Sequence, residues 1–246
     1  MSLVSIDGEL GEGGGQILRT ALTLSAVTGQ GFEMTRVRAR RARPGLRPQH
    51  LAAVRAAAMA CRAEVHGAFD GSPDLRFVPG EVTAGDFDFD IGTAGATTLV
   101  LQTILPILAA HSDPSRVAVS GGTHVPLSPS FHFVARHWVP VVGQLGLRVR
   151  VVLERAGFVP RGEGRVRAET SAWTRPTTLD LTRRGSLVEI RGLSASARLK
   201  GDVARRQCEA ARALLWEQRR LESHLSLIHI SEPTRRTIPS RMPSSA

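Results

Sequence analysis

The amino-acid sequence predicts an α/β fold in which a β-α-β-α-β-β unit occurs twice. Helical segments of about 12–17 residues alternate with short β-branched segments that have the period of a strand. A glycine-rich segment leads into an apolar helical pattern at residue 11 and again at residue 92. Because 42% of the 246 residues are hydrophobic, the chain has enough apolar residues for a sizeable core.

The first unit begins with Gly11–Gly15, and the helix that follows ends at Gly29, a residue type that commonly stops helices. The pattern predicts, in order, a helix over 16–27, a strand over 31–37, a helix over 48–64 and a strand over 75–78. In the second helix, apolar residues at helical spacing predict one stripe packed against a sheet: Leu51, Val54, Ala58, Cys61 and Val65. On this stripe, Cys61 is predicted to be a small core residue rather than a reactive thiol.

The second unit begins with a strand over 86–90, in which Asp and Phe alternate strictly. Its three aspartates could ligate a metal, but a strand with one polar face accounts better for the alternation. The remaining elements are predicted in the order helix 96–110, strand 116–120, helix 129–145, strand 147–153 and strand 164–168.

Residues 1–178 are therefore predicted to form a main domain of two repeats, and residues 179–224 to form the first part of a smaller α/β domain. In this smaller domain we expect strands over 179–181 and 187–191. We also expect an amphipathic helix over 202–216, with four inward residues: Val203, Ala210, Ala213 and Leu214.

Residues 225–246 differ in character from the rest of the sequence. They are rich in Ser, Pro and Arg, and residues 225–235 resemble the conceptual translation of a transposase adapter used in DNA sequencing libraries. The alternative is an ordinary disordered tail of this composition. We expect an artefactual, non-native addition, with the natural sequence continuing beyond His224.

Composition and charge exclude several classes of protein. The sequence has no apolar run of 18 residues, no recognisable secretory signal and only two cysteines, so we expect a cytoplasmic protein without a membrane span. The formal net charge of +10 predicts attraction to polyanions. Arginine supplies every basic residue except Lys200, and Asn and Tyr are absent, so part of the arginine bias reflects a G/C-rich genome.

Two segments have the features of phosphate sites. Gly11–Gly15 lets the backbone approach a ligand closely, the following helix presents free N–H groups, and Arg19 lies one turn into that helix. A tight packing turn accounts for these glycines equally well. Residues 36–47 hold six arginines beside a helix start, which favours an anion site over a solvated basic loop. Alternation along a strand would divide the six between two faces, so not all can point into one site.

Two further glycine-rich loops adjoin predicted strands. Residues 120–124 follow a strand, where ligand sites of α/β proteins lie, and residues 157–164 form a glycine hairpin; both could simply be tight turns. Of the eight histidines, His50 and His124 lie in the glycine- and arginine-rich loops. The motifs of metalloproteases, α/β-hydrolases and β-lactamases do not occur.

Several segments together carry a resemblance to a known family: 7–8, 11–19, 28–29, 38–50, 91–106, 120–123 and 157–164. Over Val4–His224, the sequence resembles the RNA 3'-terminal phosphate cyclases. The resemblance implies a fold like that of the enolpyruvyl transferases, which is built of repeated βαβαββ units. It also implies a smaller inserted α/β domain that begins near residue 179.

The resemblance implies an ATP-dependent, ligase-type reaction in RNA processing. A histidine attacks the α-phosphorus of ATP, which gives a histidinyl-AMP and pyrophosphate, and the AMP then passes to an RNA 3'-phosphate. The neighbouring 2'-hydroxyl attacks the activated phosphate, forms a 2',3'-cyclic end and releases AMP. A divalent metal ion, Mg²⁺ or Mn²⁺, assists. The implied partners are ATP and RNA with a 3'-terminal phosphate, and the oligomeric state stays open.

The same resemblance assigns active-site positions to Glu12, Arg19, Arg38, Arg41 and Gln49, and nucleotide-pocket positions to Gln102 and Pro129. It identifies no metal ligand. The nucleophilic histidine of the family lies near the C-terminus, beyond the inserted domain. None of the eight histidines is therefore given that role, and we expect this chain to be an inactive fragment.

Two residues depart from the family pattern. His132 stands where an acidic residue is usual, and Glu163 stands in a hairpin that is normally all glycine. Two other functions stay open: a non-catalytic cyclase-like protein that binds RNA or assists assembly, and an enolpyruvyl transferase with the same fold. The arginines and Gln49 favour an enzyme over the first, and the motif at 11–19 is not expected in the second.

Overall fold

The computed structural model describes residues 3–11, 13–183, 185–197, 199, 202–219 and 223–230. The chain divides into two compact units, Met1–Leu179 and Asp180–Ala246. The first unit contains two repeats with the same order of elements, and the second contains a single β-α-β segment. The mixed α/β fold class expected from the sequence is therefore confirmed.

The first repeat consists of β1 (Val4–Asp7), α1 (Gly15–Thr28), β2 (Phe32–Thr35), α2 (Pro48–Cys61), β3 (Glu64–His66) and β4 (Leu75–Val78). Its strands form one sheet in the order β1-β2-β4-β3. Strands β1 and β2 are parallel, and the other two pairings are antiparallel. Strand β3 lies where the sequence pattern extended the second helix to residue 64, because Arg62 adopts a left-handed conformation and ends α2.

The second repeat consists of β5 (Asp86–Asp90), α3 (Thr97–Leu108), β6 (Ser115–Gly121), α4 (Phe131–Phe133), the π-helical turn η1 (Val134–Trp138), α5 (Val139–Gln144), β7 (Val149–Arg155) and β8 (Gly164–Thr170). Its sheet has the order β5-β6-β8-β7, and β5 and β6 are its parallel pair. Because the two sheets share strand order and direction, the internal repeat predicted from the sequence is confirmed.

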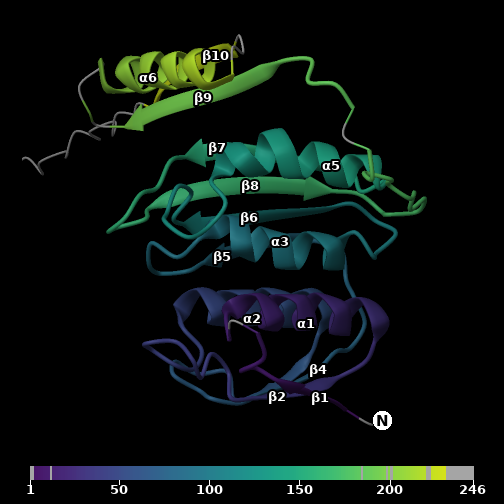
Figure 1. Cartoon of the computed structure of the whole chain (residues 1–246). Helices are drawn as coiled ribbons and strands as arrows, with labels where there is room; N and C mark the ends of the chain where they lie inside the picture. The colour runs from purple at the N-terminus through teal and green to yellow at the C-terminus, as the bar shows by residue number, and fades with distance from the viewer. Residues whose placement is uncertain are drawn as a thin grey trace, which may run out of the picture. The chain divides into compact units, whose positions relative to one another are not determined.

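Helices α1, α2 and α3 pack against one another, and Figure 1 shows α1 and α2 between the first sheet and α3. Five alanines of α2 are at most 1% exposed and allow this close packing: Ala52, Ala53, Ala56, Ala57 and Ala60. All five residues of the expected stripe belong to the core or pack against it, with Val54 and Cys61 fully buried, but the buried face of α2 is wider than a single stripe. The reason is that α2 contacts helices on two sides, α1 and α3, and not a sheet alone.

Cys61 is a core residue, as expected. Its thiol is buried and donates a hydrogen bond to the Ala57 carbonyl oxygen at 3.1 Å. Burial raises the pKa of the thiol to about 11, so the nucleophilic thiolate is disfavoured at neutral pH.

One face of the second sheet is polar. Along β5 the three aspartates are exposed while Phe89 is buried, as expected for a strand with one polar face. Arg165 on β8 pairs with Asp88 and with Glu154 on β7, and the Arg165 guanidinium lowers the pKa of Asp88. These carboxylates are therefore partners of arginines across the sheet.

The second unit contains β9 (Ile190–Ala197), α6 (Asp202–Arg219) and β10 (Ser223–Ile230), with β9 and β10 parallel. The expected strand over 179–181 is not formed, and the strand expected over 187–191 lies at 190–197. Strand β10 includes the first six residues of the segment 225–246 that composition set apart. The rest of that segment lies outside the described residues, and its origin stays a prediction.

Helix α6 is amphipathic, but its buried face differs from the one expected. Ala204 and Cys208 are 5% and 4% exposed, whereas Leu214 is 53% exposed. The expected inward set, which included Ala210 and Ala213, was therefore wrong. The buried residues Ala204 and Cys208 are four positions apart and share one helix face, which differs from the face of the residues expected to point inward.

We expect Glu163→Gly to stabilise the protein. Glu163 has a φ of 53° in the turn before β8, and a side chain in this left-handed conformation costs about 1 kcal/mol. The hydrogen bond that the turn accepts from Arg155 goes to the Glu163 carbonyl oxygen, so it survives the change. Urea unfolding should give a free energy of unfolding about 1 kcal/mol higher than that of the wild type. Glu163→Ala, which keeps a Cβ, is the control, and equal stability of the two variants would contradict this prediction.

Candidate phosphate-binding site

The glycine-rich turn before α1 lies against basic side chains. Gly14 is the N-cap of α1 and provides no side-chain hydrogen bond to the free N–H groups. A Cβ atom on Gly14 would lie 3.0 Å from a guanidinium nitrogen of Arg41. A Cβ atom on Gly15 would overlap His50 Nε2 and would lie 2.9 Å from a guanidinium nitrogen of Arg19. Glycine therefore brings the positive end of α1 next to three basic side chains.

Arg19 is the most buried arginine of this group. It is 8% exposed, and one of its guanidinium nitrogens donates to Gln16 Oε1 at 3.0 Å. Its Nε finds no hydrogen-bond partner among the described residues. Burial lowers the pKa of Arg19 to about 10, which still leaves the guanidinium charged at neutral pH. A buried, charged side chain with a free donor is suited to an anionic oxygen.

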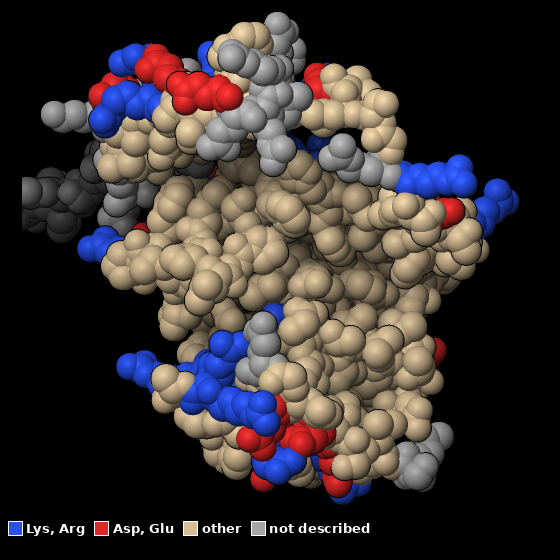
Figure 2. All heavy atoms as spheres, viewed as in Figure 1, with Lys and Arg blue, Asp and Glu red and all other residues tan. Residues whose placement is uncertain are grey.

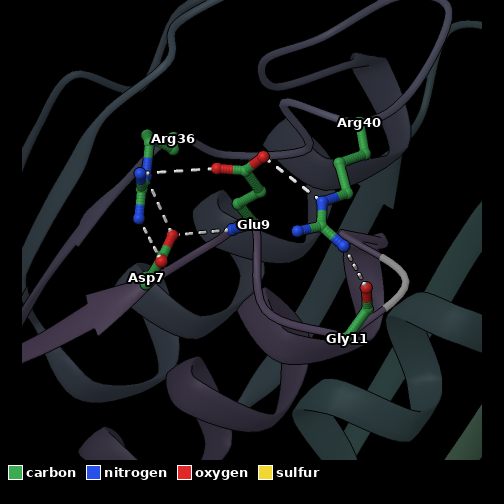
Figure 3. Close-up of polar contacts among 5 residues, drawn as sticks. All are labelled: Asp7, Glu9, Gly11, Arg36 and Arg40. Atoms are coloured by element: carbon green, nitrogen blue, oxygen red, sulfur yellow. Dashed lines mark hydrogen bonds and ion pairs between the residues drawn. The ribbon is translucent and has the colours of Figure 1, made fainter.

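The arginine-rich segment 36–47 is a series of turns rather than a strand, since β2 ends at Thr35. The arginines therefore do not alternate between two faces of a strand. What distinguishes them is whether an acidic side chain pairs with them. Figure 3 shows Arg36 and Arg40 directed at carboxylates at and just after the end of β1, with Arg36 bound to Asp7 and both arginines bound to Glu9. These two guanidinium groups are occupied by acidic partners.

The contacts of Asp7 and Glu9 fix the position of the loop. The backbone N–H of Glu9 donates to Asp7 Oδ1 at 3.0 Å, and Arg40 Nε lies 3.2 Å from Glu9 Oε1. The Glu9 N–H bond and then the Arg36 guanidinium lower the pKa of Asp7. Asp7 and Glu9 thus hold one part of the arginine loop, and Arg41 lies against Gly14 at the start of α1.

Arg38 and Arg41 were both predicted to hold phosphate, and they differ in surroundings. Arg38 is partly buried and donates to the carbonyl oxygens of Arg43 and Gly45, both at 2.8 Å. Burial, followed by the charges of Arg41 and Arg47, lowers the pKa of Arg38. Arg41 is exposed and lies against Gly14. Arg38 therefore shapes the loop as well as adding charge, whereas Arg41 is exposed beside the start of α1.

His50 is a functional candidate that the predicted site residues did not include. It is 3% exposed at the third position of α2, and its Nδ1 accepts the backbone N–H of Arg47 at 3.1 Å. Burial and then the charges of Arg38, Arg19 and Arg47 lower the pKa of His50 to about 3. The imidazole is therefore neutral with its proton on Nε2, the atom that faces Gly15. Its place three residues after a helix N-cap was the available sequence signal.

Gln49 connects this cluster to the start of α3. Its Oε1 accepts the backbone N–H of Ala96, the N-cap of α3, at 3.3 Å. A Cβ atom on Gly95 would lie 2.9 Å from Gln49 Cβ, so this loop also depends on glycine. The N-terminal ends of α1 and α2 therefore meet at the basic side chains, and Gln49 joins them to the N-terminal end of α3. Aligned peptide dipoles make each of these ends positive.

The predicted nucleotide-pocket residues lie along one face of α3. Gln102 lines a cavity of about 230 Å³ together with Arg19 and Gln16. Pro129 is not among the lining residues of this cavity; its carbonyl oxygen accepts a hydrogen bond from Thr98 at 2.8 Å. Thr98 and Gln102 are four residues apart and share a helix face. Gln102 and Arg19 therefore lie next to each other in this cavity. Pro129 contacts Thr98, which lies one helical turn before Gln102 on α3.

The region has a strong excess of basic groups. Figure 2 shows blue Lys and Arg side chains gathered over the first repeat, beside a group of red acidic side chains. Glu12, which was predicted to belong to the site, lies outside the described residues. In the described part of the chain, no group of three or more His, Cys, Asp or Glu side chains could hold a metal ion. The basic groups of the described residues fit the phosphate groups of a ligand.

The sequence profile of the RNA 3'-terminal phosphate cyclases matches residues 10–226 of the chain. The chain belongs to this family. The match includes the glycine-rich turn, the arginine loop and the start of α3, which together form the site. All the segments that the structure brings together at the site therefore lie within the part of the chain that matches this family.

Three curated relatives named RNA 3'-terminal phosphate cyclase are similar to the chain. The protein from Ralstonia nicotianae is 50% identical over 211 residues, which are 85% of this chain and 61% of the relative. Those from Methylococcus capsulatus and Koribacter versatilis are 44% and 45% identical, over 87% of this chain and 62% and 61% of the relatives. The chain therefore spans only about three-fifths of the length of these relatives. Among its described helices, none is both long and apolar enough to cross a membrane.

We expect the buried neutral His50 to make stability depend on pH. Between pH 6.5, the ordinary pKa, and about pH 3, the unfolded state binds a proton that the folded state does not. The contribution of His50 is therefore fully present above pH 6.5 and is lost as the pH falls, by about 1.4 kcal/mol per pH unit. His50→Asn retains an acceptor for the Arg47 N–H but does not titrate.

The measurement is the free energy of unfolding of the wild type and of the Asn variant from pH 8 to pH 5. Other titrating groups cancel in the difference between the two proteins. This difference should be constant above pH 6.5 and should change below it in favour of the variant. Parallel profiles throughout would show that His50 does not lose its proton on folding.

Proposed function

We propose that the chain carries the phosphate-binding part of an ATP-dependent RNA 3'-phosphate cyclase, a ligase-type enzyme that converts an RNA 3'-phosphate into a 2',3'-cyclic phosphate. The observation that supports this proposal is the meeting of the N-terminal ends of α1 and α2 with Arg19, Arg38 and Arg41, with the start of α3 joined to them by Gln49. Phosphate groups of ATP and of the RNA end are the anions that such a site favours. Family membership supports ATP and RNA as the ligands.

The reaction that we propose proceeds through a histidinyl-AMP and an RNA adenylate. The residues of this chain would neutralise and orient phosphate groups while bonds at phosphorus change. Arg19 would act from within the protein and Arg41 from its surface, on either side of the first turn of α1. Gln102, beside Arg19, would contact the nucleotide. A divalent ion bound with ATP would neutralise further phosphate charge, and no described residue is assigned to it.

A non-catalytic role in RNA binding is the alternative. It is favoured by one observation: the described histidine in the cluster, His50, is buried and has its Nδ1 bonded to backbone. In that case the residues of the cluster would bind RNA but would not catalyse a reaction. Cyclisation of a 3'-phosphorylated RNA distinguishes the two functions.

We expect Arg41→Ala to weaken binding of RNA with a 3'-phosphate. The exposed guanidinium lies at the start of α1, and loss of a charged hydrogen bond to phosphate should lower the affinity about tenfold. Anisotropy titrations with a labelled oligoribonucleotide at several salt concentrations would measure this loss, together with a decrease of about 1 in the salt slope. Arg55→Ala is the matched control, since Arg55 is an exposed arginine further along α2.

The RNA with a 3'-hydroxyl completes this test. Its affinity should be the same for the wild type and for Arg41→Ala. If Arg55→Ala and Arg41→Ala weaken both RNAs equally, the effect is one of net charge, and Arg41 has no specific role at the phosphate.

We expect the 246-residue chain to form no covalent adenylate. The described histidines include none that combines exposure with a place in the arginine cluster. Incubation with ATP labelled at the α-phosphate, followed by denaturing electrophoresis, should leave the protein unlabelled. Labelling that is lost in His50→Asn would identify a nucleophile in this chain and would contradict this part of the proposal.

A further inference from the structure

Two loops of the second repeat form a rigid corner. The segment 121–124 follows β6, and the hairpin 157–163 connects β7 with β8. The backbone N–H of Thr123 donates to the Gly157 carbonyl oxygen at 2.9 Å, and the N–H of Gly157 donates to Thr123 Oγ1 at 2.9 Å. Within the hairpin, the N–H of Gly162 donates to the Phe158 carbonyl oxygen at 2.7 Å. A Cβ atom on Gly157 would overlap the Gly162 carbonyl, so the hairpin has little freedom.

Phe158 presents an aromatic ring at this corner. One side of the ring stacks on His124, with centroids 5.2 Å apart and an angle of 22° between the rings, while the residue is 39% exposed. The His124 ring is held at both nitrogens, by Thr123 Oγ1 at 2.8 Å and by His132 Nδ1 at 2.9 Å. Phe158 is therefore an exposed ring on a fixed support, and His132, the departure from the family pattern, belongs to that support.

The corner adjoins the phosphate-binding cluster through one loop. A Cβ atom on Gly162 would lie 2.8 Å from Ala94 Cα, so the hairpin packs on the loop before α3. The next residue of that loop, Gly95, accepts the N–H of Gly122 at 2.8 Å and lies against Gln49 on its other side. The corner and the cluster therefore contact opposite sides of the same short loop.

We propose that Phe158, supported by His124, is a stacking platform for a nucleobase of single-stranded RNA near its 3' end. Proteins hold single-stranded RNA by stacking its bases on aromatic side chains and by attracting its backbone with positive charge. The hairpin provides both, since Arg161 is exposed two residues beyond Val159, which is itself 57% exposed. The inference rests on the proposed function, which places the 3'-phosphate in the arginine cluster, and adds a site for the adjoining nucleoside.

The test compares two labelled RNAs that both end in a 3'-phosphate, one with a normal terminal nucleotide and one whose terminal ribose lacks the base. Anisotropy titrations of the 246-residue chain should show about tenfold tighter binding of the RNA with the base. Phe158→Ala should remove this difference and should leave binding of the abasic RNA unchanged. Phe158→Trp, which retains an aromatic ring, should keep it, and Phe158→Leu, which retains apolar volume, should not.

Two controls establish whether the base preference belongs to the Phe158 ring. Phe69→Ala alters a phenylalanine that is 61% exposed in the corresponding hairpin of the first repeat, and it should have no effect. Binding of ATP should be the same for the wild type and Phe158→Ala, and an equal loss of ATP and RNA affinity would assign the ring to ATP and overturn the proposal. Circular dichroism establishes that each variant is folded.

The outcomes distinguish this inference from the proposed function. If Phe158→Ala and Phe158→Leu bind both RNAs like the wild type, or weaken both equally, the platform is wrong while a preference for 3'-phosphate over 3'-hydroxyl still supports the cyclase function. If the wild type does not prefer the 3'-phosphate but keeps a base preference that depends on Phe158, the platform stands and the proposed phosphate site fails.

Discussion

The close approach of glycine backbone to side chains is the constraint on which the site depends. At Gly15 a Cβ atom would occupy the position of the His50 imidazole, and at Gly95 it would press on Gln49. These contacts fix the start of α1 against α2, and the start of α3 against α2. With any larger residue at these positions, the helix ends would separate, and the positive end of each helix would face solvent instead of a shared site.

This packing leaves the cluster with an excess of buried positive charge. His50 remains neutral because burial, and then the charges of three arginines, lower its pKa, but Arg19 remains charged although it is nearly buried. Charge in such a place is unfavourable unless an opposite charge compensates it. Phosphate would supply that charge, and part of its binding energy would come from relief of the repulsion that Arg38 experiences from Arg41 and Arg47. The cluster is thus arranged in advance for an anion.

Most of the fold could be predicted because glycines, prolines and apolar periodicity mark its elements directly. Helix α1 lies within one residue of its predicted bounds at each end, and β4 and β5 match theirs. The buried faces of α2 and α6 could not be predicted, since their alanines fit either side of a helix. Within the site, nothing local indicates that Arg36 and Arg40 bind Asp7 and Glu9, because these pairs join segments about 30 residues apart and depend on the parallel pairing of β1 and β2. The surroundings of His50 could not be predicted either. A histidine near a helix start indicates a cap, and only the folded structure shows that Arg19 and Arg38 lie near it.

The two repeats place equivalent loops in equivalent positions, and this relates the arginine cluster to the aromatic corner. In each repeat, the loop after the second strand packs on the hairpin between the last two strands. In the first repeat, a Cβ atom on Gly45 would overlap the Gly71 backbone. In the second, a Cβ atom on Gly157 would lie only 2.6 Å from the Gly121 carbonyl oxygen. One backbone arrangement thus carries guanidinium groups in the first repeat and aromatic rings in the second. If the proposed function holds, the phosphate of an RNA end would meet the loop of the first repeat and its base the loop of the second, so the duplication would supply one loop for each group.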